Sequence, residues 1–212
     1  MKPAWVSPIA ARTLLLASGS PARLRLLREA GIEPRVVVSG ADESAEPGLG
    51  TATVVAMLAE RKAAAVAALH PRSLVLGCDS LLDVDGQPMG KPVTADSAIA
   101  LLRRLAGREA VLYTGHRLID GGSGRQASGV AATVVRFGCP TDAELAAYVA
   151  TGEPLQLAGA FSIDGRGAPF IDGIDGDPSN VIGLSLPLLR RLLAELDIAI
   201  TDLWRPTRPA PP

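Results

Sequence analysis

Apolar, strand-like segments of this chain run directly into helical patterns, and the first such junction is the tightest. The apolar run 14–17 stops at the sequence SGSP, and a helical pattern begins at once over residues 21–30. Ser20 suits the N-cap of that helix, and Pro21 suits its first turn. A strand joined to a helix by so few residues predicts an α/β fold, and similar alternations recur along the chain.

The remaining segments extend this alternation and add one hairpin. Helices are predicted over residues 51–70, 94–108, 141–152 and 184–196. Strands are predicted over residues 13–18 and 35–43, in parts of 73–92, and in a hairpin around the sequence GGSGR. A short strand is expected near residues 168–171. Because a hairpin interrupts the alternation, we predict a three-layer α/β fold with a mixed sheet.

Composition excludes several classes of protein. Hydrophobic residues make up 48% of the 212 residues, which is enough for a sizeable core. The formal net charge of -1 gives no global basic field, so we expect no nucleic acid partner. No apolar stretch approaches the ~18 residues of a membrane span, so we expect no membrane partner. We expect one domain over residues 1–212, with frayed ends over 1–12 and 205–212.

The two cysteines, Cys78 and Cys139, lie far apart in the sequence and form no metal-binding or redox motif. Each is therefore interpreted as a small apolar residue in a reducing compartment. The apolar run LLLA near the N-terminus is too short for a secretory signal. We expect a cytoplasmic protein.

The first strand–helix junction also suits an anion. A helix start carries unpaired N–H groups and the positive end of the helix dipole. The hydroxyls of Ser18 and Ser20 and the guanidinium of Arg23 add donors, so the turn is a candidate phosphate site. An ordinary capped helix explains the same residues when they are taken alone.

Lysine is rare in this chain, because 18 of its 21 basic residues are arginine. Lys62 and Lys91 are the two lysines away from the N-terminus, and a compact point charge is one reason to keep lysine there. The simpler interpretations are that Lys62 lies on the surface of a helix and that Lys91 lies in a turn.

Two carboxylates occupy positions that are costly unless they have a role. Asp79 follows the apolar run LVLGC, and a carboxylate there needs a charged partner or a cation. We predict that Asp79 lies at the carboxyl end of a strand, as a metal ligand or a base for water. The alternative interpretation of Asp79 is that its side chain stabilises an Asx turn. Glu43 ends the predicted strand 35–43, and its alternative interpretation is a solvated turn.

Five motifs, in order along nearly the whole chain, resemble the Maf family of nucleoside triphosphate pyrophosphatases. They are LASGSPAR at 16–23, SGADE at 39–43 with LAERKA at 58–63, LGCDS at 76–80 with GKP at 90–92, YTG at 113–115, and the long glycine- and aspartate-rich segment 157–189. The resemblance implies an elongated α/β domain with a central cleft, similar to inosine triphosphatase, and commonly a homodimer.

The resemblance also implies an activity: hydrolysis of a nucleoside triphosphate to the monophosphate and pyrophosphate with a divalent cation, Mg²⁺ or Mn²⁺. It implies that Asp79 accepts a proton and that Glu43 and Asp79 associate with the metal. The residues implied on the substrate side are Ser18, Ser20, Arg23, Lys62, Lys91 and Asp164. These roles agree with phosphoryl chemistry, which depends on positioning and charge neutralisation.

Three positions depart from the family pattern. Ala22 stands where many relatives have arginine, and Asp164 stands where the pyrimidine-preferring relatives have glutamine. Ser80 stands in place of a frequent threonine. The preference for pyrimidines is therefore not carried over. Asp164 is instead a candidate acceptor for a base amino group or a cationic methylated purine.

Two other functions remain open at this point. The sequence LLDVDG resembles the nucleophile motif of haloacid-dehalogenase-type phosphatases, with Asp83 as nucleophile, Asp85 as acid/base and Thr114 as the middle hydroxyl. A hairpin turn is the simpler interpretation of DVDG. A nucleotide-binding regulator of cell division without catalytic activity is the second alternative. The released product, phosphate or pyrophosphate, distinguishes the two enzymes, and the absence of turnover distinguishes the regulator from both.

Overall fold

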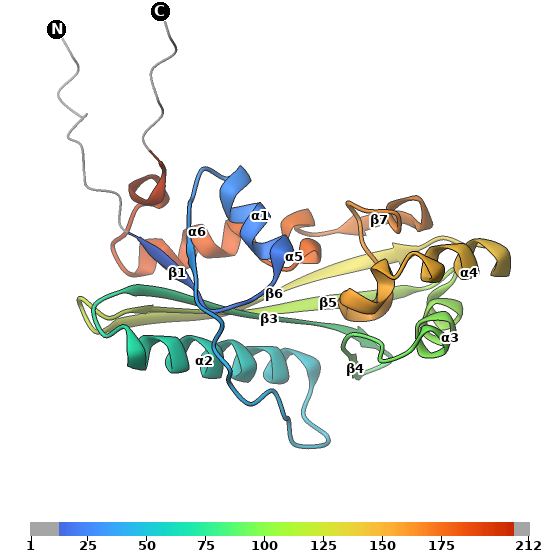
Figure 1. Ribbon diagram of the computed structural model, residues 1–212, viewed down its shortest axis with the longest axis horizontal. Helices are drawn as coiled ribbons and strands as arrows, with labels where there is room; N and C mark the ends of the chain where they lie inside the picture. The colour runs from blue at the N-terminus through green and yellow to red at the C-terminus, as the bar shows by residue number, and fades with distance from the viewer. Residues whose placement is uncertain (1–12, 206–212) are drawn as a thin grey trace, which may run out of the picture.

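A computed structural model describes residues 13–205, and it is built around one mixed sheet (Figure 1). The strand order is β2-β1-β3-β5-β6-β7, and β4 pairs with the far end of β3. The predicted frayed segment 1–12, and all but the first residue of the segment 205–212, lie outside the described residues. The assignment of the whole chain to one domain stays a prediction.

Parallel and antiparallel pairing divide the sheet into two parts. Strands β2 (Arg35–Val36), β1 (Leu14–Leu16) and β3 (Leu74–Val84) are parallel to one another. The antiparallel part continues from β3 through three further strands, which are β5 (Glu109–Asp120), β6 (Arg125–Phe137) and β7 (Ile171–Asp175). Strand β4 (Gln87–Met89) turns back onto β3 in a hairpin. The mixed sheet that the sequence predicts is confirmed.

Helices cover both faces of the sheet (Figure 1). Helix α2 (Thr51–Leu69) lies on one face, and the helices α1 (Pro21–Glu29), α5 (Pro178–Ile182) and α6 (Leu186–Glu195) lie on the other. Helices α3 (Ala95–Leu105) and α4 (Asp142–Ala150) pack together at one end of the molecule. The three-layer α/β architecture is therefore as predicted, and the molecule is elongated.

Alternation along the strands divides the apolar side chains between the two faces. Leu14 and Leu16 pack with α1 and α6, whereas Leu15 packs with α2. Strand β3 alternates in the same way, since Leu76 and Cys78 pack toward α1 and α6 while Val75 packs toward α2. Because this alternation continues along β3, neighbouring residues farther along the strand also point to opposite faces of the sheet.

Helix α2 lies unusually close to the sheet at two glycines. A Cβ atom on Gly77 would collide with the backbone of Ala59, and one on Gly115 would collide with the backbone of Val55. Because neither glycine carries a side chain, α2 contacts β3 and β5 through backbone atoms. This contact brings Lys62, one turn along α2 from Ala59, next to β3.

The structure departs from the predictions at four places. The strand predicted over 35–43 spans only Arg35–Val36, because its neighbour β1 has just three residues. The short strand expected near 168–171 lies at Ile171–Asp175, and helix α5 was missed because its five residues are too few to show a period. Asp79 lies inside β3 rather than at its end, so neither the strand-end prediction nor the Asx turn is correct.

Within residues 13–205, no helix is long and apolar enough to cross a membrane. Both cysteines are free, but only Cys78 is buried as expected, whereas Cys139 is exposed. Burial raises the pKa of the Cys78 thiol to about 12.

Candidate active site

A gap in the pairing of β3 places two neighbouring polar residues at the edge of a large cavity. Strand β3 pairs with β1 as far as Leu76 and with β4 from Leu82 onward, and Asp79 and Ser80 lie between these pairings. The cavity has a volume of about 1730 Å³. Its lining includes every site residue predicted from the sequence, namely Ser18, Ser20, Arg23, Glu43, Lys62, Asp79, Lys91 and Asp164.

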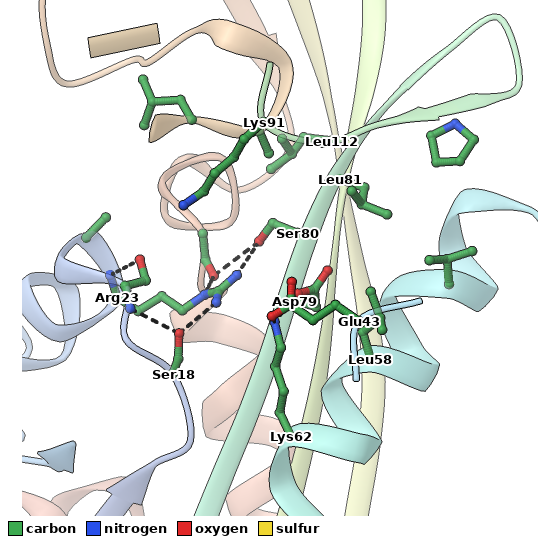
Figure 2. A pocket seen from close by; sticks show the side chains of 18 of the residues that line it. Ser18, Arg23, Glu43, Leu58, Lys62, Asp79, Ser80, Leu81, Lys91 and Leu112 are labelled. Atoms are coloured by element: carbon green, nitrogen blue, oxygen red, sulfur yellow. Dashed lines mark hydrogen bonds and ion pairs between the residues drawn. The ribbon is translucent and has the colours of Figure 1, made fainter. Parts of the chain in front are cut away.

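On the α2 face of the gap, one ammonium group lies between two carboxylates (Figure 2). Lys62 Nζ lies 2.5 Å from Asp79 Oδ1 and 2.7 Å from Glu43 Oε1. The Lys62 and Asp79 side chains are about one-tenth exposed, whereas the Glu43 side chain is 64% exposed. The group therefore carries one positive and two negative charges, with its excess negative charge facing the cavity.

On the α1 face of the gap, Arg23 is held by neutral acceptors. Its Nε donates to the carbonyl oxygen of Gly183 at 2.7 Å, and its two terminal nitrogens donate to the hydroxyls of Ser18 and Ser80, each at 2.9 Å. Arg23 is only 8% exposed. A guanidinium has five N–H donors, so two remain for a ligand. Its full positive charge is also available, since none of these partners is charged.

The turn between β1 and α1 supplies further donors. The Ser18 hydroxyl accepts hydrogen bonds from Arg23 and from the Ser20 N–H group, the latter at 3.2 Å. A hydroxyl has two acceptor sites and one proton, so the Ser18 proton remains free for donation to a ligand oxygen. Ser20 is the N-cap of α1, and its hydroxyl accepts from the Arg23 N–H group. The capped helix and the candidate phosphate site therefore share the same residues.

A buried network supports Arg23 from behind. The hydroxyls of Ser80 and Thr114 lie 2.9 Å apart, and Thr114 also donates to the carbonyl oxygen of Asn180. Beside them, His116 Nε2 accepts from the N–H group of Ser185 at 2.9 Å, so Nδ1 carries the proton and donates to the Thr114 carbonyl. Burial lowers the pKa of His116 to about 4, so the ring is neutral.

The two remaining predicted residues, Lys91 and Asp164, line the same cavity. Figure 2 shows the Lys91 side chain extending into the cavity from the segment after β4. The Asp164 carboxylate forms an ion pair with Arg25 of α1. The segment that carries Asp164 is thereby joined to α1, a contact that the sequence pattern does not predict.

The sequence pattern also did not reveal the polar residues that support other residues of the candidate site. Ser80 was noted only as a departure from a threonine, yet it holds Arg23. Thr114 was considered only for a different mechanism. Glu153 lines the cavity and gave no signal in the sequence, because a single glutamate after a helix has no distinctive spacing.

The haloacid-dehalogenase interpretation is not supported by the positions of its aspartates. Asp83 accepts from the Thr51 hydroxyl and from the Gly86 N–H group, and Asp85 is paired with Arg104 and Arg108. The sequence DVDG forms the turn between β3 and β4, as the simpler interpretation predicted. Neither aspartate is among the residues that line the cavity.

Comparison with known proteins identifies the family. The profile of the family described as Maf-like protein matches residues 13–196. Proteins named nucleoside triphosphate pyrophosphatase are similar over nearly their whole length: one from Streptomyces coelicolor is 59% identical, covering 95% of this chain and 98% of its own. One from Streptomyces avermitilis is 57% identical, covering 92% and 96%, and one from Salinispora tropica is 54% identical, covering 90% and 87%.

A weaker structural match is the Ham1 protein of Staphylococcus aureus, with a TM-score of 0.42 at 18% identity over 60% of this chain and 72% of that one. The match of the family profile to most of the chain, together with relatives above 50% identity, establishes the family. The chain belongs to the Maf-like protein family.

Proposed function

We propose that the protein hydrolyses a nucleoside triphosphate between its α- and β-phosphates and releases the monophosphate and pyrophosphate. One observation carries the proposal: the gap in β3 presents a negative group, Glu43–Lys62–Asp79, on one face and an unneutralised arginine, Arg23, on the other. A triphosphate with a divalent cation matches that pair of charges. The names of the similar proteins support the same activity.

The phosphate groups would lie against Arg23 and the start of α1. The two free N–H groups of Arg23 can bind two phosphate oxygens together, and the Ser18 proton can bind a third. Ser20 and the first turn of α1 line the same end of the cavity. Lys91 lines it as well and brings a mobile point charge to the phosphates.

Glu43 and Asp79 would hold the cation. Within residues 13–205, no cluster of three or more histidine, cysteine, aspartate or glutamate side chains forms a complete metal site. Two carboxylates that contact the same ammonium nitrogen nevertheless fit Mg²⁺ or Mn²⁺, because such ions combine one or two carboxylates with water and substrate phosphates. The cation would neutralise the negative charge that develops on the phosphates.

Asp79 would also act as the proton acceptor. It is buried, contacts Lys62 and lines the cavity. The attacking water would give its proton to the carboxylate while its oxygen bonds to one phosphorus. The bridging oxygen would leave with the other phosphoryl product, which completes hydrolysis of the anhydride.

The nucleoside would lie along the remaining lining of the cavity, which includes Phe161 and Asp164. We propose that Asp164 accepts a hydrogen bond from the base and that Arg25, its present partner, moves or shares the contact. An Asp164→Asn enzyme with an unchanged preference among bases would contradict this role.

A product assay tests the proposed function. Purified protein is incubated with a panel of standard and modified nucleoside triphosphates and Mg²⁺ or Mn²⁺, and pyrophosphate and phosphate are quantified separately. We expect pyrophosphate from the wild type and a loss of about a thousandfold in Asp79→Asn, as for removal of a general base. Asp85→Asn is the matched control, since Asp85 lies outside the cavity. Phosphate as the only product, or full activity in Asp79→Asn, would refute the proposal.

We also propose a homodimer in the cytoplasm, as the family resemblance implies for assembly and the free cysteines imply for location. Light scattering on the purified protein and fractionation of cells test the two parts. A monomer at micromolar concentration would contradict the first part.

A further inference from the structure

The wall of the cavity that carries Asp164 is folded around one carboxylate, that of Glu153. Glu153 Oε1 accepts from the Ser162 hydroxyl at 2.7 Å, from the Tyr148 hydroxyl at 3.1 Å and from the Gly167 N–H group at 3.3 Å. Oε2 accepts from the Arg166 N–H group at 3.1 Å. All but one of these donors belong to the segment 162–167, so the segment wraps the carboxylate.

Two glycines allow this close wrapping. A Cβ atom on Gly165 would lie 2.5 Å from Glu153 Oε1, and one on Gly167 would lie 2.5 Å from the Tyr148 hydroxyl oxygen. Side chains at these positions would push the segment away from Glu153. The segment 162–167 therefore has the shape it has because a carboxylate lies at its centre.

The carboxylate is in its charged form. Burial raises the pKa of Glu153, but the Ser162 hydroxyl and the N–H groups of Arg166 and Gly167 lower it by more, so the pKa lies below its ordinary value. Hydrogen bonds to a charged acceptor are stronger than neutral ones, which makes Glu153 a firm anchor.

The anchored segment is also part of the cavity. Ser162, Asp164 and Gly165 all line it, and Asp164 is the residue that reaches Arg25. Arg23 and the start of α1 form the phosphate end, so the segment 162–167 faces the part of the substrate beyond the phosphates. Asp164 belongs to this segment, whereas Arg23 is held by Ser18, Ser80 and Gly183, so a shift of the segment acts first on Asp164.

We propose that Glu153 is a positioning residue for nucleoside recognition, which acts by fixing the segment 162–167 and through it Asp164. The inference rests on the proposed function, because it requires that the cavity binds a nucleoside triphosphate. It makes a separate claim, however. Loss of Glu153 weakens recognition of the nucleoside and leaves recognition of the triphosphate intact.

The test compares two ligands in one variant. Glu153→Gln keeps the size of the side chain but turns an NH₂ group toward donors that need an acceptor. For the best nucleoside triphosphate in the product assay, we expect KM to rise about tenfold, the loss typical of a charged hydrogen-bond acceptor. Inorganic tripolyphosphate, which has no nucleoside, should inhibit wild type and variant with the same Ki.

Glu144→Gln is the matched control. Glu144 accepts from Thr141 at the start of α4, the helix that carries Tyr148, but it does not contact the segment 162–167. Glu144→Gln should keep the wild-type KM for the nucleoside triphosphate and the wild-type Ki for tripolyphosphate. If Glu153→Gln does not fold, Tyr148→Phe provides the second variant, since it removes one donor and keeps the ring packed on Phe170. It should raise KM in the same direction by a smaller factor.

Each outcome decides the inference. A rise in KM with an unchanged Ki supports it. An unchanged KM, or equal increases in KM and Ki, overturns it, because Glu153 would then have no role or a general structural one. These outcomes require pyrophosphate release by the wild type, so they leave the proposed function standing. A wild type that releases no pyrophosphate overturns both.

Discussion

The two faces of β3 use opposite means to hold a cationic side chain. On the α2 face, Lys62 is bound by the carboxylates of Asp79 and Glu43, and the group has an excess negative charge. On the α1 face, Arg23 is bound by hydroxyls and a carbonyl, and its positive charge is not neutralised. Neighbouring residues of one strand, Asp79 and Ser80, determine this difference because they point to opposite faces.

In the proposed function, this one short gap in the sheet binds a substrate and a cation of opposite charge. A carboxylate partner in place of Ser80 would neutralise Arg23 and weaken its attraction for phosphate. A neutral partner in place of Asp79 would leave Lys62 positive and remove a ligand for the cation. The predictions below test whether the two faces differ in this way.

The largest effect is expected from Arg23→Gln. It removes the charge that we propose binds the phosphates, and we expect kcat/KM for pyrophosphate release to fall by roughly 10²–10³, as for loss of a main electrostatic donor. Steady-state kinetics measures the fall. Arg28→Gln on the same helix is the control, since Arg28 is exposed and pairs with Glu33. Equal effects of the two substitutions would contradict a special role for Arg23.

The next effect concerns the stability of the α1 face in acid. Burial lowers the pKa of His116 to about 4, and a charged ring could no longer accept from Ser185. The unfolded chain binds this proton below pH 6.5 and the folded chain only near pH 4, so stability is lost as pH falls through this window. The loss from this group is roughly 3 kcal/mol.

Urea unfolding between pH 7 and pH 4 measures this loss. The slope of stability against pH should be smaller in His116→Gln than in the wild type. His70→Gln, which removes the only other histidine of the chain, should keep the wild-type slope. Parallel slopes in the wild type and His116→Gln would show that His116 does not titrate in this window.

A smaller effect is expected from Ser80→Ala. The change removes one acceptor from a buried guanidinium but keeps its charge, and we expect KM for the triphosphate to rise about tenfold. Ser80→Thr keeps the hydroxyl and should restore a KM within about twofold of the wild type. A threonine variant as weak as the alanine variant would show that shape at this position, rather than the hydroxyl, supports Arg23.

The smallest effect is expected from Asp85→Asn. Its carboxylate is half-exposed and pairs with Arg104 and Arg108 at the β3–β4 turn, away from both faces of the gap. Exposed ion pairs contribute little to stability or activity. Kinetics and thermal unfolding should match the wild type, whereas a large loss of activity would return the turn aspartates to consideration.

Which residues line the candidate site could be predicted from the sequence better than how they are arranged. Asp79 and Arg23 were found because a carboxylate after an apolar run and a guanidinium at a helix start are costly or useful by themselves. The place of Asp79 within β3 could not be found, because β3 continues past its parallel partner into an antiparallel hairpin. The contacts of Ser80 with Arg23 and of Asp164 with Arg25 join segments far apart in the chain, and no local pattern encodes such contacts.

The most direct test of the two-faced site is a pair of calorimetric titrations, one with Mn²⁺ alone and one with tripolyphosphate in the presence of a chelator. The account predicts that Glu43→Gln weakens Mn²⁺ binding and leaves tripolyphosphate binding unchanged. It predicts the reverse for Arg23→Gln. If either substitution weakened the binding of both ligands equally, the two faces of the gap would not have separate roles. The proposed division of the site would then be wrong.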